Sequence, residues 1–292
     1  MSIGLALSGG AVLGTAHIGV MKALAEAQIP CTMVSGTSAG SLVGGIYASG
    51  RSLKEMEDAA LSLTDNMLDF NSSGAAKALV GSVFGRRSSF SGFFKGNEVF
   101  KLAYRMTGGM YIREAPIMVA LSAVDVNSGN TVFFTNVDIP SVKGDYVVKN
   151  NILMAEAITA SCTIPAVFVP RRVGEMTLVD GGVTEYVPVK VLRDMGADYV
   201  IAVDLGRAAG VRKKPDDMLE IVGQSYEIMA RRLAENSLTH ADTVIAPYVS
   251  DIGLFEFKRI PELIERGYNA ARRMIPTIKM QMIRAGSRRV AT

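Results

Sequence analysis

The chain has 292 residues, of which 49% are hydrophobic and 20% are charged, and its formal net charge is +3. Such a composition can fill the core of one large α/β domain, and so weak a charge argues against a dedicated nucleic-acid-binding protein. The two cysteines, Cys31 and Cys162, have no C-x-x-C spacing and no neighbouring histidine pair. We therefore expect reduced thiols rather than a disulfide scaffold or a zinc site.

The N-terminal segment does not read as a targeting signal. Residues 1–4 lack a basic stretch and lead directly into an apolar strand, which is not the pattern of a secretory leader. Residues 3–27 are apolar enough to resemble a membrane span, but they contain several glycines together with His17, Lys22 and Glu26. We expect a cytoplasmic protein whose contact with a membrane, if it has one, is peripheral at the inner face.

The first predicted elements are a strand, a glycine loop and a helix. Ile3–Leu7 is apolar throughout, as in a strand covered on both faces, Ser8–Gly14 is the loop, and Thr15–Gln28 has helical spacing. A dinucleotide site would need G-x-G-x-x-G and an acidic residue ending the next strand, and neither is present. The loop is better suited to an oxyanion hole made of backbone N–H groups, because a serine turn follows it.

The serine turn is the feature around which the rest of the chain is organised. A strand ending near Met33–Val34 runs into Gly36-Thr37-Ser38-Ala39-Gly40 and then into an apolar helix over Leu42–Ala48. Such a turn lifts the hydroxyl of Ser38 out of the sheet and aims the first N–H groups of the helix at it, which suits a nucleophile. The alternative is a plain strand-to-helix turn without chemistry.

Hydrophobic periodicity predicts the remaining elements, which alternate between strands and helices as in an α/β fold with a layered, largely parallel central sheet flanked by helices. A hairpin turn at Asn127-Ser128-Gly129 joins two of the strands. The expected strands are Ile117–Val126, Asn130–Thr135, Ala166–Pro170, Met176–Val179, Tyr199–Leu205 and Thr243–Ala246. The expected helices are Leu53–Asp65, Glu98–Met106, Ile152–Ser161, Val187–Met195, Met218–Leu238 and Pro261–Ala285, the last with a kink at Pro276.

Two segments depart from this alternation within what we expect to be a single domain over residues 1–292. Residues 66–96 mix glycine, serine and phenylalanine, and could form a cap or mobile lid with apolar tips or a surface insertion that its phenylalanines anchor. Residues 258–292 carry nine basic and two acidic residues, with apolar side chains at helical spacing. This end could lie on anionic lipid or could be a closing helix with a solvated basic face.

A serine nucleophile needs a base, and three candidates are available. His17 lies just after the glycine loop, where it could equally support that loop from the helix. His240 could complete a Ser-Asp-His order with Asp204, or could be a surface residue. Asp180 follows the strand Met176–Val179 and precedes two glycines, which is where α/β sheets place ligands.

Three ordered motifs resemble those of the patatin-like phospholipases: Ser8-Gly9-Gly10 through Gly14, the Gly-Thr-Ser-Ala-Gly turn, and Asp180-Gly181-Gly182. The stretches Ala16–Val20 and Ala160–Pro165 are similar to that family as well. The resemblance implies a patatin-like fold and a catalytic dyad in which Ser38 is the nucleophile and Asp180 its base, with no metal or other cofactor. Backbone N–H groups would form the oxyanion hole, from Gly9, Gly10, Ala11 and Ala39.

The chain departs from the family pattern at two places. Ala11 and Leu13 stand where the family often has a third glycine and a basic residue, and Glu185-Tyr186-Val187-Pro188 stands where many relatives have asparagines before the proline. We expect a serine acyl hydrolase acting on phospholipids, lysophospholipids or other acyl esters. A lipid acyltransferase or thioesterase using the same acyl-serine, and a catalytically silent lipid-binding protein, are the alternatives.

Overall fold

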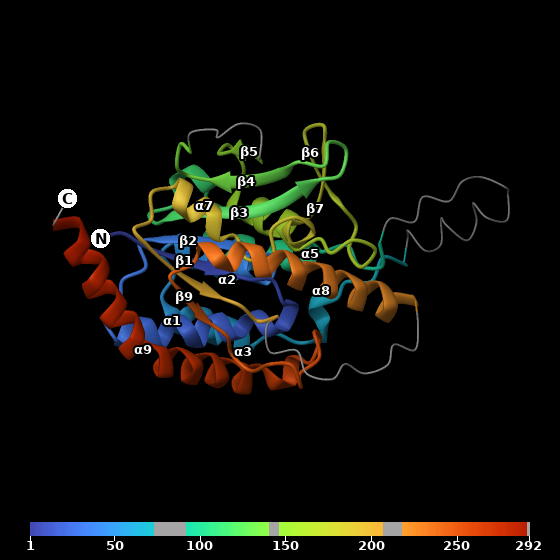
Figure 1. The fold of residues 1–292 in the computed structure, drawn as a ribbon. Coiled ribbons are helices and arrows are strands. Elements are labelled where there is room, and N and C mark those ends of the chain that lie inside the picture. The colour runs from blue at the N-terminus through green and yellow to red at the C-terminus, as the bar shows by residue number, and fades with distance from the viewer. Residues whose placement is uncertain (73–91, 140–145, 207–217, 291–292) are drawn as a thin grey trace, which may run out of the picture.

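A nine-stranded sheet forms the centre of the structure, a computed structural model that describes residues 1–72, 92–139, 146–206 and 218–290 (Figure 1). Its strands follow the order β5-β4-β3-β2-β1-β8-β9, and β7 pairs with both β3 and β6. The strands are β1 (Ile3–Leu7), β2 (Met33–Thr37), β3 (Met118–Asp125), β4 (Thr131–Thr135), β5 (Tyr146–Lys149), β6 (Arg171–Val173), β7 (Met176–Asp180), β8 (Tyr199–Val203) and β9 (Thr243–Ile245).

The prediction of a mostly parallel sheet is confirmed. The strands β3, β2, β1, β8 and β9 pair in parallel, whereas β4 and β7 run antiparallel to β3. In this register Leu5 lies between Val34 and Ile201, so β1 and β2 end at the same edge of the sheet. The glycine loop after β1 and the serine turn after β2 therefore become neighbours.

Helices cover both faces of the sheet. Alternate residues of each strand enter two cores: Leu5, Leu7 and Ile201 pack in the larger core with α1, α2, α6 and α9, while Ala6 and Ala202 pack in the smaller core with α7 and α8. The helices are α1 (Ala16–Glu26), α2 (Ala39–Ala48), α3 (Leu53–Leu61), α5 (Asn97–Thr107), α6 (Met154–Ser161), α7 (Val189–Asp194), α8 (Met218–Ser237) and α9 (Ile260–Val290).

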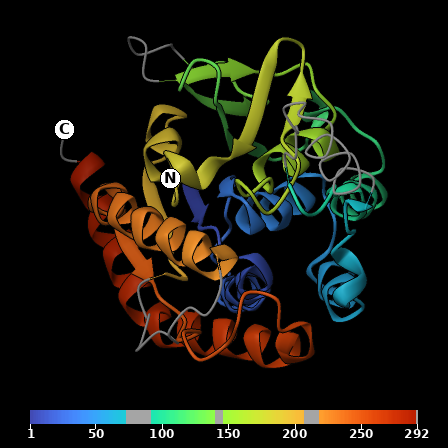
Figure 2. The ribbon, with the colours of Figure 1, turned by 90° about the vertical axis from the view of Figure 1, so that its right-hand side faces the viewer.

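The C-terminal helix α9 lies beside α1, the first helix of the chain, as both ribbon views show (Figures 1 and 2). Glycines allow the close approach: a Cβ atom at Gly19 would overlap the carbonyl oxygen of Ile264, and one at Gly267 would overlap that of Ala16. The helix continues through Pro276 and bends on its way to the C-terminus (Figure 1). This agrees with the predicted closing helix and its kink.

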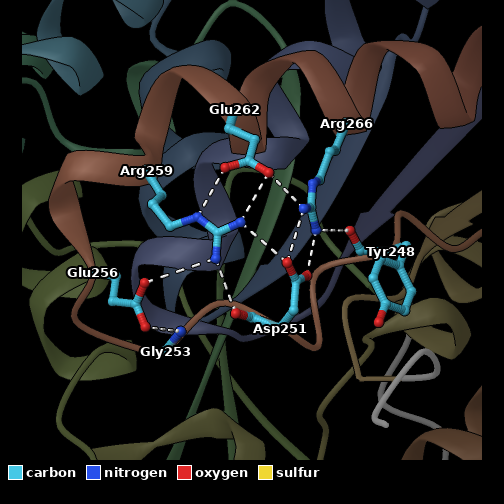
Figure 3. A network of polar contacts seen from close by, with 7 residues as sticks. All are labelled: Tyr248, Asp251, Gly253, Glu256, Arg259, Glu262 and Arg266. Carbon is cyan, nitrogen blue, oxygen red and sulfur yellow. Dashed lines mark hydrogen bonds and ion pairs between the residues drawn. The ribbon is translucent and has the colours of Figure 1, made fainter.

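A polar network joins the start of α9 to the loop that follows β9 (Figure 3). Arg259 and Arg266 both bind the carboxylates of Asp251 and Glu262. These donors hold the pKa of Asp251 well below its usual range, the hydrogen bonds from Arg266 being the largest cause. The network fixes a loop whose Leu254 carbonyl accepts a hydrogen bond from the N–H of Val12, at 3.1 Å, and thereby braces the glycine loop.

One predicted strand is wrong. The residues expected to form a strand over Ala166–Pro170 form a turn with only an isolated bridge between Phe168 and Phe94, and the strand β6 begins at Arg171. Ala166 has φ +66°, which takes the backbone out of the extended region. The apolar side chains that suggested a strand serve instead to pack this turn, and the rings of Phe94 and Phe168 lie 5.8 Å apart.

The expected cap or lid at 66–96 is described only at its two ends, since residues 73–91 lie outside the described part of the chain. At those ends Phe70 bridges Phe94, with ring centroids 6.3 Å apart, and the N–H of Phe93 donates to the carbonyl of Val167. The segment is thus anchored next to the turn that follows α6. In the described ranges, no helix combines the length and the apolar character that crossing a membrane requires.

Candidate active site

Ser38 occupies a sharp elbow between β2 and α2. Its φ of +54° and ψ of −121° lie outside the regions that L-residues favour, so the turn holds the serine in a strained conformation. A Cβ atom at Gly36 would overlap the carbonyl of Gly40, and one at Gly40 would overlap that of Leu7. Only glycine on both sides of the serine therefore allows the bend to pack against β1.

A chain of hydroxyl groups fixes the elbow from the side of α6. The backbone N–H of Ser38 donates to Oγ of Ser161 at 2.8 Å, and Ser161 donates in turn to Oγ of Ser41 at 2.7 Å. Ser41 completes the chain by donating to the carbonyl of Gly36 at 2.7 Å. All these groups are buried, so the orientation of the elbow depends on Ser161, a residue 123 positions away in sequence.

Asp180 lies at the end of β7, in register with Ala123 of β3, and its side chain is buried. The same turn that supplies Ser161 holds the aspartate, because the N–H of Asp180 donates to the carbonyl of Thr163 at 2.9 Å. Its Oδ1 atom accepts hydrogen bonds from the N–H of Gly182 at 2.8 Å and from the hydroxyl of Tyr226 at 3.0 Å. The candidate nucleophile and the candidate base are thus anchored to one segment.

The two carboxylate oxygens of Asp180 differ in their hydrogen bonds. Oδ2 is buried and no described residue forms a hydrogen bond of regular geometry with it. The Ser38 hydroxyl is nevertheless close enough to lower the pKa of Asp180 by interacting with its charged form. Burial is the larger influence and raises that pKa to about 6, so the carboxylate remains a usable base at neutral pH.

A raised pKa on a buried carboxyl predicts that Asp180→Asn stabilises the fold. Between the ordinary value of 3.8 and the folded value of about 6 the native state binds more protons than the unfolded state, so stability falls as pH rises through this window. Above it the ionised carboxylate costs the native state about 3 kcal/mol. Denaturant unfolding should therefore show Asp180→Asn to be about 2 to 3 kcal/mol more stable than wild type at pH 8 and close to wild type at pH 4.

The exposed Asp58→Asn is the matched control, because Asp58 lies on the surface of α3 and, among the described residues, its side chain pairs with Lys54 alone. We expect it to change the free energy of unfolding by less than about 1 kcal/mol at either pH. Equal stability of wild type and Asp180→Asn at pH 8 would contradict a buried, ionised carboxylate at this site.

The glycine loop presents unpaired N–H groups beside Ser38. Gly10 has φ +153° and Ala11 has φ +49°, and no acceptor in the described ranges binds the N–H of Gly10, Ala11 or Ala39. The N–H of Gly9 differs, since it donates to the carbonyl of Tyr186 at 3.2 Å. Three of the four predicted oxyanion donors are thus unpaired in the described ranges, and their role as donors stays a prediction. The alanine that replaces the family's glycine takes a left-handed conformation.

Two side chains from outside this loop, and one of its own, hold it in place. His17 is fully buried and its Nε2 lies 2.9 Å from the carbonyl oxygen of Ser8. Burial lowers the pKa of His17 to about 4, so the imidazole is neutral and supports the loop. The hydroxyl of Tyr186 donates to the carbonyl of Gly9 at 3.0 Å, and the hydroxyl of Ser8 accepts from the N–H of Leu205 at 3.1 Å.

The alternative Ser-Asp-His order is not assembled. His240 is exposed after α8, and its backbone carbonyl accepts from Arg193. Asp204 is buried after β8, where its Oδ1 accepts from the N–H of Gly206 at 2.9 Å. Within the described residues, neither histidine side chain forms a hydrogen bond with Ser38. Asp180 is the candidate whose pKa the Ser38 hydroxyl influences, after the larger effect of burial.

A separate cavity lies away from Ser38 and Asp180. An apolar cavity of about 460 Å³ is lined by residues that include Leu5, Cys31 and Tyr47, which places it near the start of β2, whereas Ser38 follows the end of that strand. Both cysteines are free. No group of three or more histidine, cysteine, aspartate or glutamate side chains converges as a metal site in the part of the chain that the structure describes.

Sequence reasoning did not find three residues of the site. Ser161 belongs to the Ala160–Pro165 stretch that resembles the family, but nothing in the stretch indicated that its hydroxyl holds the elbow. No sequence pattern indicated the contacts of Tyr226 and Tyr186, because each hydroxyl reaches its partner only through the tertiary fold.

Comparison with known proteins matches this chain to one family. The sequence model described as Patatin-like phospholipase matches residues 5–193. An uncharacterized NTE family protein of Mycobacterium bovis is 31% identical over 209 residues, which cover 71% of this chain and 50% of that protein. Lysophospholipase NTE1 of Mycosarcoma maydis is 28% identical over 305 residues, covering 93% of this chain and 14% of the relative.

The chain thus spans about half the length, or less, of these curated relatives. Among solved structures, VipD from Legionella pneumophila aligns over 94% of this chain and 66% of its own, with a TM-score of 0.49 and 13% identity. The type III effector protein ExoU aligns over 94% of this chain and 53% of its own, with a TM-score of 0.45 and 14% identity.

Proposed function

Because this chain belongs to the patatin-like phospholipase family, we propose that it is a serine acyl hydrolase that cleaves acyl esters of phospholipids, lysophospholipids or related lipids. One observation carries the proposal: Ser38 stands at a strained elbow and interacts with the charged form of a buried Asp180, whose Oδ2 has no regular hydrogen bond within the described residues. The relative named a lysophospholipase supports a lipid ester as the substrate class. The residues it would use are Ser38 as nucleophile and Asp180 as its base.

In the first half of the proposed reaction, the Ser38 oxygen attacks the acyl carbon of the ester while its proton passes to Oδ2 of Asp180. The carbonyl electron pair moves onto the acyl oxygen, where the free N–H groups of Gly10, Ala11 and Ala39 stabilise the negative charge. The intermediate then collapses, the alcohol oxygen leaves and takes the proton from Asp180, and an acyl-serine remains.

Water completes the cycle by the same route in reverse. It attacks the acyl carbon and gives its proton to Asp180, and the Ser38 oxygen leaves and recovers that proton as the fatty acid is released. A carboxylate with a pKa of about 6 is suited to both transfers, because it is ionised at neutral pH and yet basic enough to accept a proton in the transition state.

The proposal is tested by fatty-acid release from a lysophospholipid and from a soluble short-chain ester, with Ser38→Ala as the blank. We expect the wild-type protein to hydrolyse both substrates and the variant to hydrolyse neither. Binding of lysophospholipid without release of fatty acid from any ester would instead identify a silent lipid-binding protein. Transfer of the acyl chain to an added alcohol in preference to water would identify an acyltransferase.

A cytoplasmic location, a single domain over residues 1–292 and peripheral contact with anionic lipid through residues 258–292 stay predictions. The contacts of Arg259 and Arg266 bear on which basic residues could contact lipid. Arg259 and Arg266 are engaged by Asp251 and Glu262, so a contact with lipid head groups would fall to the basic residues further along the helix.

A further inference from the structure

Tyr226 reaches the candidate base from α8, a helix that lies beyond the residues matched by the family model. Its hydroxyl donates to Oδ1 of Asp180 across 46 residues of sequence, at 3.0 Å. A glycine makes room for it, since a Cβ atom at Gly182 would overlap the phenolic oxygen. The contact therefore depends on Tyr226, which supplies the donor, and on Gly182, which leaves space for the phenol.

The two oxygens of the carboxylate are used differently. Oδ1 accepts two donors, the N–H of Gly182 and the phenol of Tyr226, whereas Oδ2 has no partner of regular geometry in the described residues. Two donors on one oxygen fix the plane of the carboxylate and leave the other oxygen for the Ser38 proton. We propose that Tyr226 is a positioning residue that holds Asp180 in its ionised form and aims Oδ2 at Ser38, an inference that rests on the proposed function.

The electrostatic surroundings agree with this role. In the part of the chain that the structure describes, the titratable groups that interact with Asp180 are Tyr226 of α8 and Cys162, which follows α6. Burial raises the pKa of each well above its ordinary value. Both are thus neutral over the working range, and the tyrosine remains a donor throughout. Burial alone disfavours the Asp180 carboxylate, and the hydrogen bonds to it, among them the one from Tyr226, act in the opposite direction.

The hydroxyl of Tyr226 is not what attaches α8 to the sheet. The helix buries Ala230 and Ala234 on that side, and Ala234 belongs to the core cluster shared with α7 and the strands. Removing one oxygen atom in Tyr226→Phe should therefore leave α8 in place while removing a donor from Asp180. This separates positioning of the base from simple packing.

The test is the pH profile of kcat/KM for a soluble ester, measured with wild type and Tyr226→Phe. A hydrogen bond to a charged group favours its ionised form, so the variant should move the midpoint of the acid limb up by about one pH unit. We expect about a tenfold loss near pH 5.5 and a smaller loss near pH 9, where Asp180 is ionised in both proteins. An unchanged midpoint, with the same loss at every pH, would overturn the proposal.

Tyr199→Phe is the matched control, because it also removes a buried tyrosine hydroxyl, one bound to Thr243 at 2.6 Å and to Gln281. It should keep the wild-type midpoint. Glu185→Gln should keep it as well. This control tests whether Glu185, a carboxyl whose pKa burial raises to about 7, sets the acid limb instead of Asp180. A shift in either control as large as that in Tyr226→Phe would remove the assignment to Asp180.

A second variant covers the case in which Tyr226→Phe does not fold. Gly182→Ala places a methyl group against the phenol and should move the midpoint in the same direction. If Ser38→Ala keeps its turnover, the proposed function fails and this proposal fails with it. If Ser38→Ala is inactive and the midpoint does not move in Tyr226→Phe or Gly182→Ala, only the role of Tyr226 fails.

Discussion

Ser38→Ala and Asp180→Asn should each lower kcat/KM for a soluble ester by about 10³-fold or more, because each removes one half of a unit that works together. Without the Ser38 oxygen no acyl-serine forms, and an amide at position 180 cannot accept the serine proton. This expectation is specific to Asp180, because its carboxylate is buried and its charged form interacts with the Ser38 hydroxyl. Initial rates over a range of substrate concentrations, with folding verified by circular dichroism, measure the effect.

The double variant should be scarcely slower than either single one, since residues that act as a unit are not additive. His240→Gln is the control: His240 is exposed and should retain substantial activity. A folded His240→Gln without activity, beside an active Asp180→Asn, would assign the site to a Ser-Asp-His triad instead.

Gly19→Ala should destabilise the protein by about 3 kcal/mol or more, although alanine has a higher helix propensity than glycine. The added Cβ would overlap the carbonyl oxygen of Ile264 and would lie 2.7 Å from the backbone nitrogen of Tyr268. Neither atom can move unless α9 shifts away from α1. Urea unfolding of the variant and the wild type measures the difference in free energy.

Gly223→Ala is the matched control, because it makes the same substitution in a helix at a position without close packing. Gly223 lies in α8, and apart from its own helix backbone no atom of the described part of the chain lies within 4 Å of the position its Cβ would take. Alanine is a better helix former than glycine by up to about 1 kcal/mol, so this variant should be neutral or slightly more stable. If Gly19→Ala were as stable as Gly223→Ala, α9 would not be packed closely on α1, and the basic C-terminal segment would be available for another surface.

The parts of the site that lie within short stretches could be predicted from the sequence. The turn around Ser38 and the loop around Gly10 each carry their own glycines, because local backbone geometry demands them. Asp180 was identifiable for a similar reason, since it ends an apolar strand and opens a glycine turn. The alternation of strands and helices likewise predicted the mostly parallel sheet, now confirmed.

What could not be predicted depends on contacts between distant segments. The hydroxyls of Ser161 and Tyr226 reach the elbow and the base only after α6 and α8 have packed, and no periodicity encodes that. The prediction of a strand over residues 166–170 was wrong for a related reason. Their apolar side chains suit a strand, but a left-handed Ala166 turns the chain, and Phe168 packs on Phe94 instead of pairing in the sheet.

The roles of the histidines show how burial decides between alternatives that sequence leaves open. His17 was a candidate base by its position after the glycine loop. In the fold it is fully buried, with one nitrogen bound to the carbonyl of Ser8, and desolvation lowers its pKa to about 4. It braces the loop that carries the proposed oxyanion donors.

The central claim, that Ser38 is a nucleophile activated by Asp180, is tested most directly by covalent labelling with a fluorophosphonate followed by mass spectrometry of the digested protein. The account predicts one adduct, on the peptide that contains Ser38, with no adduct in Ser38→Ala and much slower labelling in Asp180→Asn. An adduct on another residue of the folded protein, or labelling of Ser38 at the wild-type rate in Asp180→Asn, would contradict it.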